Sequence, residues 1–370
     1  MHISTGTSPA SGTFHPLTIA RAVPETESAL CLTFAVPDHL RDAFRFVPGQ
    51  YLTLRCTIDD KPVTRSYSIC SGLDDPELRI AVKRVEGGVF SCFATEQIKA
   101  GAVVEVLPPQ GNFRVDADPA RARNYLCIAA GSGITPVLSI IKSVLAREPE
   151  SRVTLLFGNQ RVATIMFREE LDALKNRHLA RFQWLNILSR ERQDVEILNG
   201  RINNKKGAEL CRHLLDLKSI DEFFLCGPEA MISEVSRGLR ANGIPESKIH
   251  YELFASSAAD AAAVIAKHHA RAMQHAGKVS EVTIISGGRE TRIELTADGE
   301  NILDGGLDNG VDLPFACKGG VCATCKAKLV EGEVDMDLNH ALTEDELRRG
   351  YILTCQAHPV SARVVVDYDQ

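Results

Sequence analysis

Four cysteines near the C-terminus constrain this chain more than any other feature. Cys317, Cys322 and Cys325 follow the spacing C-x4-C-x2-C, and Cys355 comes thirty residues later. One short loop with three thiolates and a distant fourth is the spacing that holds a [2Fe-2S] cluster. Zinc sites favour two short C-x2-4-C pairs, so a zinc site or unrelated buried cysteines are weaker alternatives. We therefore expect these four residues to ligate a [2Fe-2S] cluster.

The flanks of this cysteine loop resemble plant-type ferredoxins. Residues 312–316 (Asp-Leu-Pro-Phe-Ala) precede the loop, and residues 350–357 surround the last cysteine. The resemblance covers residues 279–370 and implies an α+β domain of the β-grasp type. Alternating apolar residues at 282–285 and 291–295 predict a hairpin at the start of this domain.

Length and hydropathy limit the class of protein. At 370 residues the chain exceeds what one hydrophobic core usually serves, so two or three domains are expected. No apolar run approaches the roughly 20 residues that span a bilayer. The first twenty residues also lack the pattern of a secretion signal. We therefore expect a cytoplasmic protein without a membrane partner.

Charge is unevenly distributed along the chain. Residues 279–370 contain 8 Lys and Arg against 17 Asp and Glu, which gives −9, whereas the whole chain carries −6. The remainder therefore carries +3. An acidic C-terminal domain can steer toward a basic partner surface. Nucleic acid is not expected as a partner.

Residues 15–118, which follow an N-terminal tail (1–14), have the pattern of an antiparallel β-barrel. Apolar residues alternate with polar ones in 29–36, 50–56 and 78–83. Such alternation is typical of strands with one face toward a core. We expect this barrel to be the first folded domain.

One predicted strand of this barrel contains the run Arg65-Ser66-Tyr67-Ser68. The planar fork of an arginine suits a diphosphate, and a tyrosine ring can stack on an isoalloxazine. The hydroxyl of Ser68 could hydrogen-bond flavin N5. An exposed strand also acquires Arg and Tyr by chance, so this run is weak evidence by itself.

Downstream, Gly88, Val89 and Ser91 open a predicted helix that continues to Ile98. A glycine-rich entry to a helix offers free amides and a positive dipole end to a phosphate. An ordinary turn with a helix cap is an equally good interpretation when this stretch is considered alone.

From Asn124 the pattern changes to alternating strands and helices. Residues 125–130 predict a buried strand, which Gly131-Ser132-Gly133-Ile134-Thr135-Pro136 and an apolar helix follow at once. Strand, glycine turn and helix form a cradle for a dinucleotide phosphate. Further strand patterns alternate with helical ones, which predicts a parallel sheet in an α/β domain over residues 119–255. The strand patterns are at 153–158, 182–188 and 222–226, and the helical ones at 166–174, 208–217 and 229–239.

Two features at predicted strand ends suggest how this domain binds its nucleotide. Ser189 and Arg190 combine a hydroxyl with a guanidinium, which suits the 2′-phosphate of NADPH. Arg161 is a second candidate for that phosphate. We expect NADPH rather than NADH, although an arginine after a strand is common. Cys226 and Gly227 end the next strand, where a cysteine is often only a packing residue.

Residues 15–255 resemble the ferredoxin-NADP reductase superfamily. The resemblance rests on R-x-Y-S at Arg65, on the G-x-x-S motif, on the Gly-Ser-Gly-Ile-Thr-Pro turn and on Cys-Gly-Pro at Cys226. It implies that Ser68, Cys226 and Glu252 shape the reacting site. It further implies cofactor-binding roles for Arg65, Tyr67, Ser68, Gly88, Val89, Ser91, Gly131, Gly133, Thr135, Pro136, Ser189, Arg190, Cys226, Gly227 and Phe254.

Residues 256–278 separate the two resemblances and are rich in alanine. Alanine favours helix, so we expect a partly helical linker. His268 and His269 lack acidic or cysteine companions nearby in the sequence, and we expect them to be solvated rather than metal-bound.

The domain order as a whole resembles the reductases of multicomponent oxygenases, most closely those that serve a di-iron phenylacetyl-CoA epoxidase. This resemblance implies FAD, NADPH and a [2Fe-2S] cluster, with a di-iron oxygenase complex as electron acceptor. A reductase for a Rieske or other di-iron hydroxylase, with FMN or NADH, is an alternative. A non-enzymatic electron carrier or redox sensor is another, but the intact motifs at Arg65, Gly131 and Cys226 argue against it.

Overall fold

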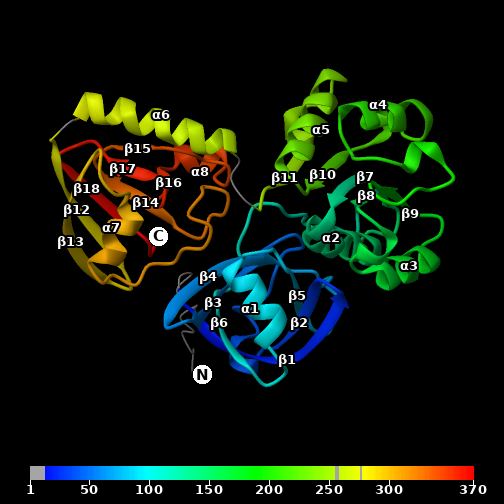
Figure 1. Cartoon of the computed structure of the whole chain (residues 1–370), viewed down its shortest axis with the longest axis horizontal. Helices are drawn as coiled ribbons and strands as arrows, with labels where there is room; N and C mark the ends of the chain where they lie inside the picture. Colours follow the sequence, from blue (N-terminus) through cyan, green and yellow to red (C-terminus); the bar gives the residue numbers. More distant parts are fainter. Residues whose placement is uncertain (1–12, 255–257, 276) are drawn as a thin grey trace.

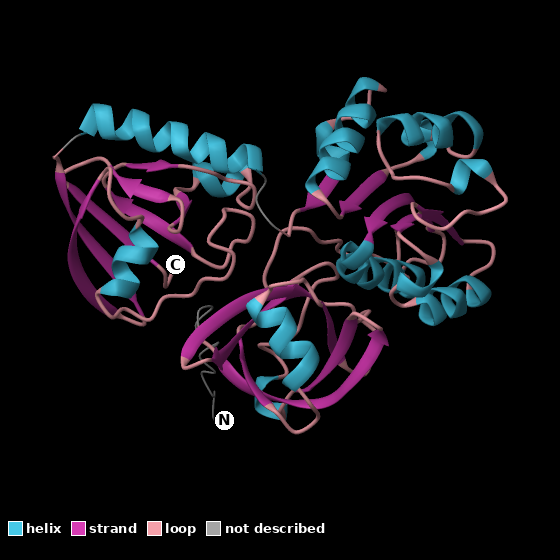
Figure 2. Ribbon diagram, in the orientation of Figure 1, coloured by secondary structure: helices cyan, strands magenta, loops and turns pink. Residues whose placement is uncertain are grey.

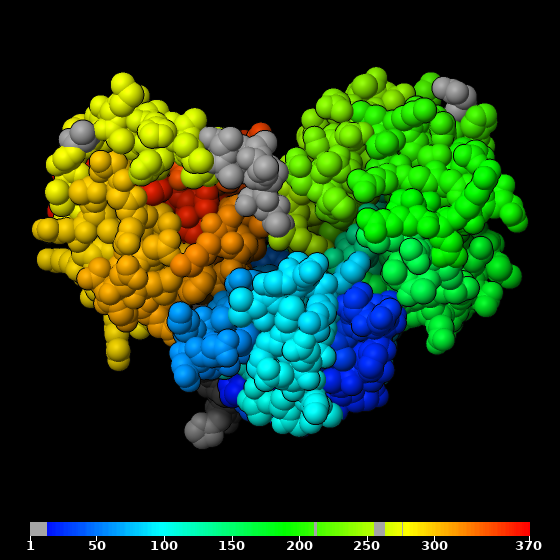
Figure 3. Space-filling view, viewed as in Figure 1, coloured from blue at the N-terminus to red at the C-terminus, as the bar shows by residue number. Residues whose placement is uncertain are grey.

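The computed structural model describes residues 13–254, 258–275 and 277–370. Most of the expected tail (1–14) and residues 256, 257 and 276 of the expected linker (256–278) lie outside these residues. The chain forms three lobes, and the second and C-terminal lobes both rest on the N-terminal barrel (Figures 1 and 3). Among the described residues, no helix combines the length and the apolar character needed to cross a bilayer.

The N-terminal lobe is an antiparallel six-stranded sheet with the strand order β4-β3-β6-β1-β2-β5. An isolated bridge between Ile69 and Ile80 links its two edges, so the sheet closes into the predicted barrel. The helix α1 (Val89–Gln97) packs against β4 and β5. The strands are β1 (His15–Thr26), β2 (Ala29–Ala35), β3 (Tyr51–Ile58), β4 (Lys61–Ser68), β5 (Leu78–Lys83) and β6 (Val103–Val106).

The second lobe is a parallel five-stranded sheet with the strand order β11-β10-β7-β8-β9. The order reverses between β7 and β10, and ligands of such sheets bind at the carboxyl ends of the strands at this point. The strands are β7 (Asn124–Ala130), β8 (Arg152–Asn159), β9 (Phe182–Leu188), β10 (Glu222–Cys226) and β11 (Ile249–Glu252). The helices are α2 (Ile134–Arg147), α3 (Arg168–Arg177), α4 (Asn204–His213) and α5 (Glu229–Ala241).

The C-terminal lobe combines a mixed five-stranded sheet, in the order β13-β12-β18-β14-β16, with a separate pair β15-β17. Short helices pack beside the sheet, as expected for a β-grasp domain (Figure 2). The strands are β12 (Val279–Ser286), β13 (Arg289–Thr296), β14 (Lys326–Glu331), β15 (Val334–Met336), β16 (Tyr351–Leu353), β17 (Ala357–Pro359) and β18 (Arg363–Asp367). The helices are α7 (Ile302–Asp308) and α8 (Glu344–Arg348).

The alanine-rich segment forms the helix α6 (Ala258–His275), which lies along the C-terminal lobe (Figure 1). Arg271 attaches it, because its buried guanidinium donates to Asp335 at 2.7 Å and to Asp337 at 2.9 Å. Lys267 adds a hydrogen bond to the carbonyl of Met336. The helix therefore packs on the C-terminal lobe and is not a free connection between lobes. His268 and His269 are exposed on it.

The outer face of the barrel packs into the apolar core around α2 of the second lobe. In β2, Leu30 and Leu32 face the barrel interior, whereas Ala29 and Cys31 pack in the core around α2. Polar contacts reinforce this interface, including the Ser139 hydroxyl, which donates to the Ser71 carbonyl at 2.6 Å. The predicted fold class of barrel, parallel sheet and β-grasp domain is confirmed.

Candidate functional site

The four predicted cluster ligands lie together at the edge of the C-terminal lobe that faces the barrel. The sulfurs of Cys317 and Cys322 are 3.1 Å apart, and the thiols of Cys325 and Cys355 hydrogen-bond to each other. Each iron of a [2Fe-2S] cluster needs two thiolates, so two pairs fit this group. Within the part of the chain that the structure describes, no three His, Cys, Asp or Glu side chains converge as a single-ion site would require.

Backbone amides of the loop point at the cysteine sulfurs. The amides of Gly319 and Cys322 each lie 3.4 Å from the Cys317 sulfur. The hydrogen bond from Cys322 and these amides lower the pKa of the Cys317 thiol to about 5. Gly320 has a φ of +72°, which lets the loop turn back over itself. Backbone amides directed at a cysteine sulfur on a tightly wound loop are what an iron-sulfur cluster requires.

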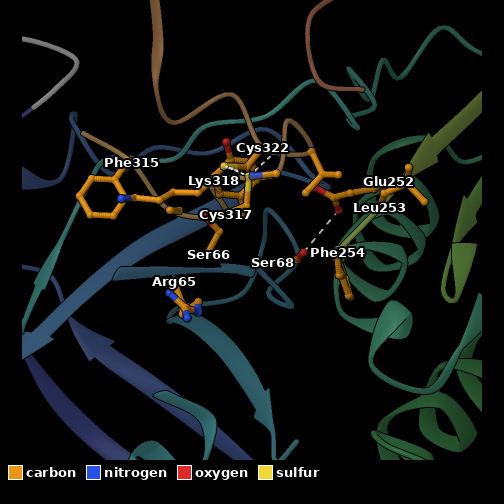
Figure 4. A pocket seen from close by; sticks show the side chains of 14 residues that line it. Arg65, Ser66, Ser68, Glu252, Leu253, Phe254, Phe315, Cys317, Lys318 and Cys322 are labelled. Atoms are coloured by element: carbon orange, nitrogen blue, oxygen red, sulfur yellow. Dashed lines mark hydrogen bonds between the residues drawn. The ribbon is translucent and has the colours of Figure 1, made fainter. Parts of the chain in front are cut away.

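A cavity of about 450 Å³ lies between part of this loop and the barrel (Figure 4). Barrel residues Arg65, Ser66 and Ser68 line one wall, and Cys317 and Cys322 line another. The cavity has polar donors on the barrel side and a wall of apolar atoms from the segment after β11. These features fit the ring system of a flavin.

Two of the three residues expected to shape the reacting site, Ser68 and Glu252, line this cavity, and the third, Cys226, is buried next to Glu252. Ser68 donates a 3.4 Å hydrogen bond to Glu252, and Glu252 lies opposite Cys226 in the parallel pair of β10 and β11. Burial raises the pKa of the Glu252 carboxyl to about 8, although the hydrogen bond from Ser68 opposes the shift. Burial, followed by the nearby Glu252 charge, raises the pKa of the Cys226 thiol well above its usual value.

The rest of the expected flavin set lies beside this cavity and does not line it. Tyr67 packs against Phe90 of α1 with ring centroids 5.4 Å apart, so the start of α1 lies next to the Arg65 strand. Gly88 is the residue before α1. Val89 is exposed, and the Ser91 hydroxyl accepts the Val85 amide at 3.1 Å.

A second cavity of about 910 Å³ opens at the carboxyl ends of β7, β8 and β10. Predicted residues that line it are Gly131, Gly133, Ser189, Arg190, Gly227 and Phe254. Thr135, Pro136 and Cys226 are buried behind its wall, where the Thr135 hydroxyl donates to the Ser132 carbonyl at 2.9 Å. Arg161 is not among the lining residues, and its backbone forms the cap of the turn at 162–164.

A glycine is required at position 133 because the turn after β7 passes close to the end of β10. A Cβ at this position would lie 2.1 Å from the carbonyl oxygen of Cys226. The glycine turn after β7 can therefore pass directly over the end of β10. This contact brings the helix start of α2 to the point where the strand order reverses.

Several lining residues of the second cavity were not predicted. Lys83 comes from the barrel, and burial lowers its pKa. Arg201 and Asn203 come from the segment before α4, so Arg201 adds a second guanidinium to the cavity that Arg190 lines. The signal for Arg201 is its position shortly after the Ser189-Arg190 pair, whereas no local pattern marks Lys83.

The two cavities are neighbours. Leu253 and Phe254, which follow β11, line both of them. In Figure 4 both side chains lie on the side of the first cavity that faces the parallel-sheet lobe, across from the cysteine loop. One short segment thus separates the cavity at the strand ends of the parallel sheet from the cavity that reaches Cys317 and Cys322.

Comparisons with known protein families agree with the division of the chain into three lobes. Residues 17–115 match the family described as an oxidoreductase FAD-binding domain, and residues 127–237 match the one described as an oxidoreductase NAD-binding domain. Residues 285–360 match the family described as a 2Fe-2S iron-sulfur cluster binding domain.

Relatives align along almost the whole chain. A component of 1,2-phenylacetyl-CoA epoxidase from Escherichia coli K12 is 44% identical, with 96% of this chain and 98% of that protein covered. The ferredoxin reductase component of 3-ketosteroid-9-alpha-monooxygenase from Rhodococcus rhodochrous is 31% identical, with 95% and 96% covered.

A solved structure shares the three-lobed fold. Phthalate dioxygenase reductase is 22% identical, with 96% of this chain and 98% of that chain covered and a TM-score of 0.55. At this identity the likeness shows the fold alone. The family is shown by the two relatives and by the three matching domain families. The chain belongs to the family of oxygenase reductases that join an FAD-binding, an NAD-binding and a [2Fe-2S] domain, and it is an NAD(P)H-dependent oxidoreductase.

Proposed function

We propose that this chain takes electrons from NADPH and passes them through FAD and a [2Fe-2S] cluster to a di-iron 1,2-phenylacetyl-CoA epoxidase. The observation that supports the electron path is the pair of adjacent cavities. Leu253 and Phe254 line both, and the cluster ligands Cys317 and Cys322 line the far wall of one. Nucleotide, flavin and cluster would therefore follow one another without a gap.

The flavin would be held by the barrel. Arg65 and the start of α1 at Gly88, Val89 and Ser91 would bind its diphosphate, and Tyr67 would pack beside its ring. When bound, FAD accepts an electron pair from NADPH and releases single electrons, which a [2Fe-2S] cluster can carry. The chain's contribution is to orient the two cofactors and to exclude water between them.

Ser68, Glu252 and Cys226 would control protons and contacts at the reacting end. The pKa of about 8 keeps Glu252 mostly protonated at neutral pH, so the carboxyl adds no negative charge to the cavity that receives electrons. Ser68 can exchange a proton with it across 3.4 Å. Cys226 is buried behind the wall of the second cavity, where its uncharged thiol would pack beneath the nicotinamide site.

NADPH is proposed because cationic and hydroxyl groups gather where the adenosine end would lie. Ser189, Arg190 and Arg201 line that part of the second cavity. A guanidinium pair suits a phosphate monoester. Gly131 and Gly133 would bind the diphosphate at the start of α2, with Thr135 and Pro136 shaping the turn, while Gly227 leaves room for the nicotinamide. Arg161 stays a more distant candidate.

The epoxidase is proposed as acceptor because the 44% identical relative is a component of that enzyme. Reconstitution tests this choice. The purified chain, NADPH and the oxygenase component of the epoxidase should form the epoxide from phenylacetyl-CoA, and catalase should not abolish it. Turnover with a Rieske oxygenase but not with the epoxidase would contradict the assignment and favour the alternative reductase role.

A further inference from the structure

The strand β3 contacts the cysteine loop through two hydroxyl side chains. Tyr51 and Thr53 are two residues apart and therefore point to the same face of the strand. The Tyr51 hydroxyl accepts the amide of Ala323 at 3.2 Å, and the Thr53 hydroxyl lies 3.2 Å from that of Thr324. Ala323 and Thr324 lie between Cys322 and Cys325 and thus join the two pairs of cluster ligands.

A chain of hydroxyls runs from the flavin cavity to this loop. Ser66 lines the cavity, and its hydroxyl lies 3.0 Å from that of Thr53. Thr53 in turn hydrogen-bonds Thr324, and both are almost fully buried. One threonine of the barrel therefore connects the cavity wall with the segment between two cluster ligands.

The ring of Tyr51 is wedged between the barrel and the loop. On the loop side it packs in a small apolar cluster with Ala316 and Cys322. On the other side Gly111 leaves room for it, because a Cβ there would lie 2.9 Å from the ring. Tyr51 also lines the flavin cavity. The ring thus limits how closely the loop can approach the barrel, and the hydroxyl limits how far it can withdraw.

Two further polar contacts between the barrel and the C-terminal lobe lie nearer the surface. Arg55 pairs with Asp312 at 3.0 Å, but the Asp312 side chain is 81% exposed. Asn112 donates to Glu346 at 2.9 Å in an exposed position. Exposed ion pairs contribute only about 0 to 1 kcal/mol. The buried contacts of Tyr51 and Thr53 are therefore better placed to define the position of the loop.

We propose that Tyr51 and Thr53 are positioning residues that seat the Ala323-Thr324 segment and so set the distance from the flavin cavity to the cluster ligands. Electron tunnelling slows steeply as distance grows. If the Ala323-Thr324 segment is held less firmly, the reduction of the cluster should therefore slow more than the reduction of the flavin. This role rests on the electron path proposed above.

The test is anaerobic stopped-flow mixing of holoprotein with NADPH, with flavin and cluster absorbance followed separately. In Thr53→Val and Tyr51→Phe, the ratio of the cluster rate to the flavin rate should fall at least threefold. It should fall at least tenfold in the double variant. Thr53→Ser retains the hydroxyl and should therefore show the wild-type ratio of the two rates. If the role of Thr53 were purely steric, retaining the hydroxyl would not preserve this ratio. Asn112→Ala, at the exposed rim, is the matched control and should also keep that ratio.

The state of the cluster is checked independently of turnover. The EPR spectrum after chemical reduction with dithionite should show an intact cluster in every variant. Wild-type ratios in both Thr53→Val and Tyr51→Phe would overturn the proposal, as would equal slowing by Thr53→Ser and Thr53→Val. Absence of cluster reduction by NADPH in the wild-type protein would instead contradict the proposed function.

Discussion

The Ser68 hydroxyl and the Glu252 carboxyl are joined by a 3.4 Å hydrogen bond across the boundary between the barrel and the nucleotide lobe. Ser68 belongs to the barrel, whereas Glu252 belongs to the nucleotide lobe. The bond therefore forms only when the two lobes are correctly assembled. It lies at the cavity that we assign to the flavin, which makes it a sensitive place to test the assignment.

The pH dependence of flavin reduction should follow Glu252. Burial raises the pKa of its carboxyl to about 8, so the group loses its proton as the pH rises through that value. The resulting negative charge opposes the arrival of electrons, and the rate of ferricyanide reduction by NADPH should fall above pH 8. Glu252→Gln keeps a hydrogen-bonding side chain without a titrating group, so its profile should be flat there. An unchanged inflection in this variant would assign the titration to another residue.

Nucleotide choice should depend on Arg190. Hydrogen bonds to charged groups contribute about 1.5–3 kcal/mol, so Arg190→Ala should raise KM for NADPH by roughly tenfold or more. KM for NADH should change little. Arg192 is the matched control, because its side chain is 89% exposed and does not line the cavity. Equal effects of Arg190→Ala on both nucleotides would remove this residue from the 2′-phosphate site.

Adding one methyl group to the glycine turn should be costly. In Gly133→Ala the new Cβ would meet the Cys226 carbonyl at 2.1 Å, and overpacking of this kind costs about 1–3 kcal/mol or more. Thermal unfolding of the holoprotein should shift downward, and KM for NADPH should rise. Gly207→Ala in α4 is the control, since a Cβ there meets nothing within 4 Å and should stabilise the helix slightly. Similar unfolding temperatures for both variants would contradict the close approach.

The helix α6 should stabilise the cluster domain through Arg271. Removing one partner of a buried ion pair costs about 3–5 kcal/mol, so Arg271→Ala should lower the temperature at which cluster absorbance is lost. The exposed Arg292 provides the control substitution Arg292→Ala. If both variants lose the cluster at the wild-type temperature, α6 acts only as a connection between domains.

Local patterns predicted most of the fold. The limits of β5, β9 and β10 agree with the expected strands, because apolar runs between polar or glycine-rich turns define them. The helix expected at 208–217 instead spans Asn204–His213. It starts early because the Asn203 side chain caps it by accepting the amide of Lys206, and the polar first turn that follows hides this start from a hydrophobic pattern.

Contacts between distant segments could not be predicted in the same way. Tyr51 and Ala323 are 272 residues apart, and nothing in either segment alone indicates that they touch. The docking of α6 depends on Arg271, whose acidic partners Asp335 and Asp337 lie in another part of the chain. Motifs located the cysteines and the glycine turns, but only the assembled lobes bring Ser68 to Glu252.

The most direct test of the relay is the anaerobic addition of NADPH to the purified holoprotein. Absorbance of both flavin and cluster should decrease, and the EPR signal of a reduced [2Fe-2S] cluster should appear. In Cys322→Ser, which removes one ligand, flavin reduction should persist while reduction of one-electron acceptors through the cluster is lost. If NADPH bleaches neither centre in the wild-type protein, or if Cys322→Ser loses both steps together, the proposed relay is wrong.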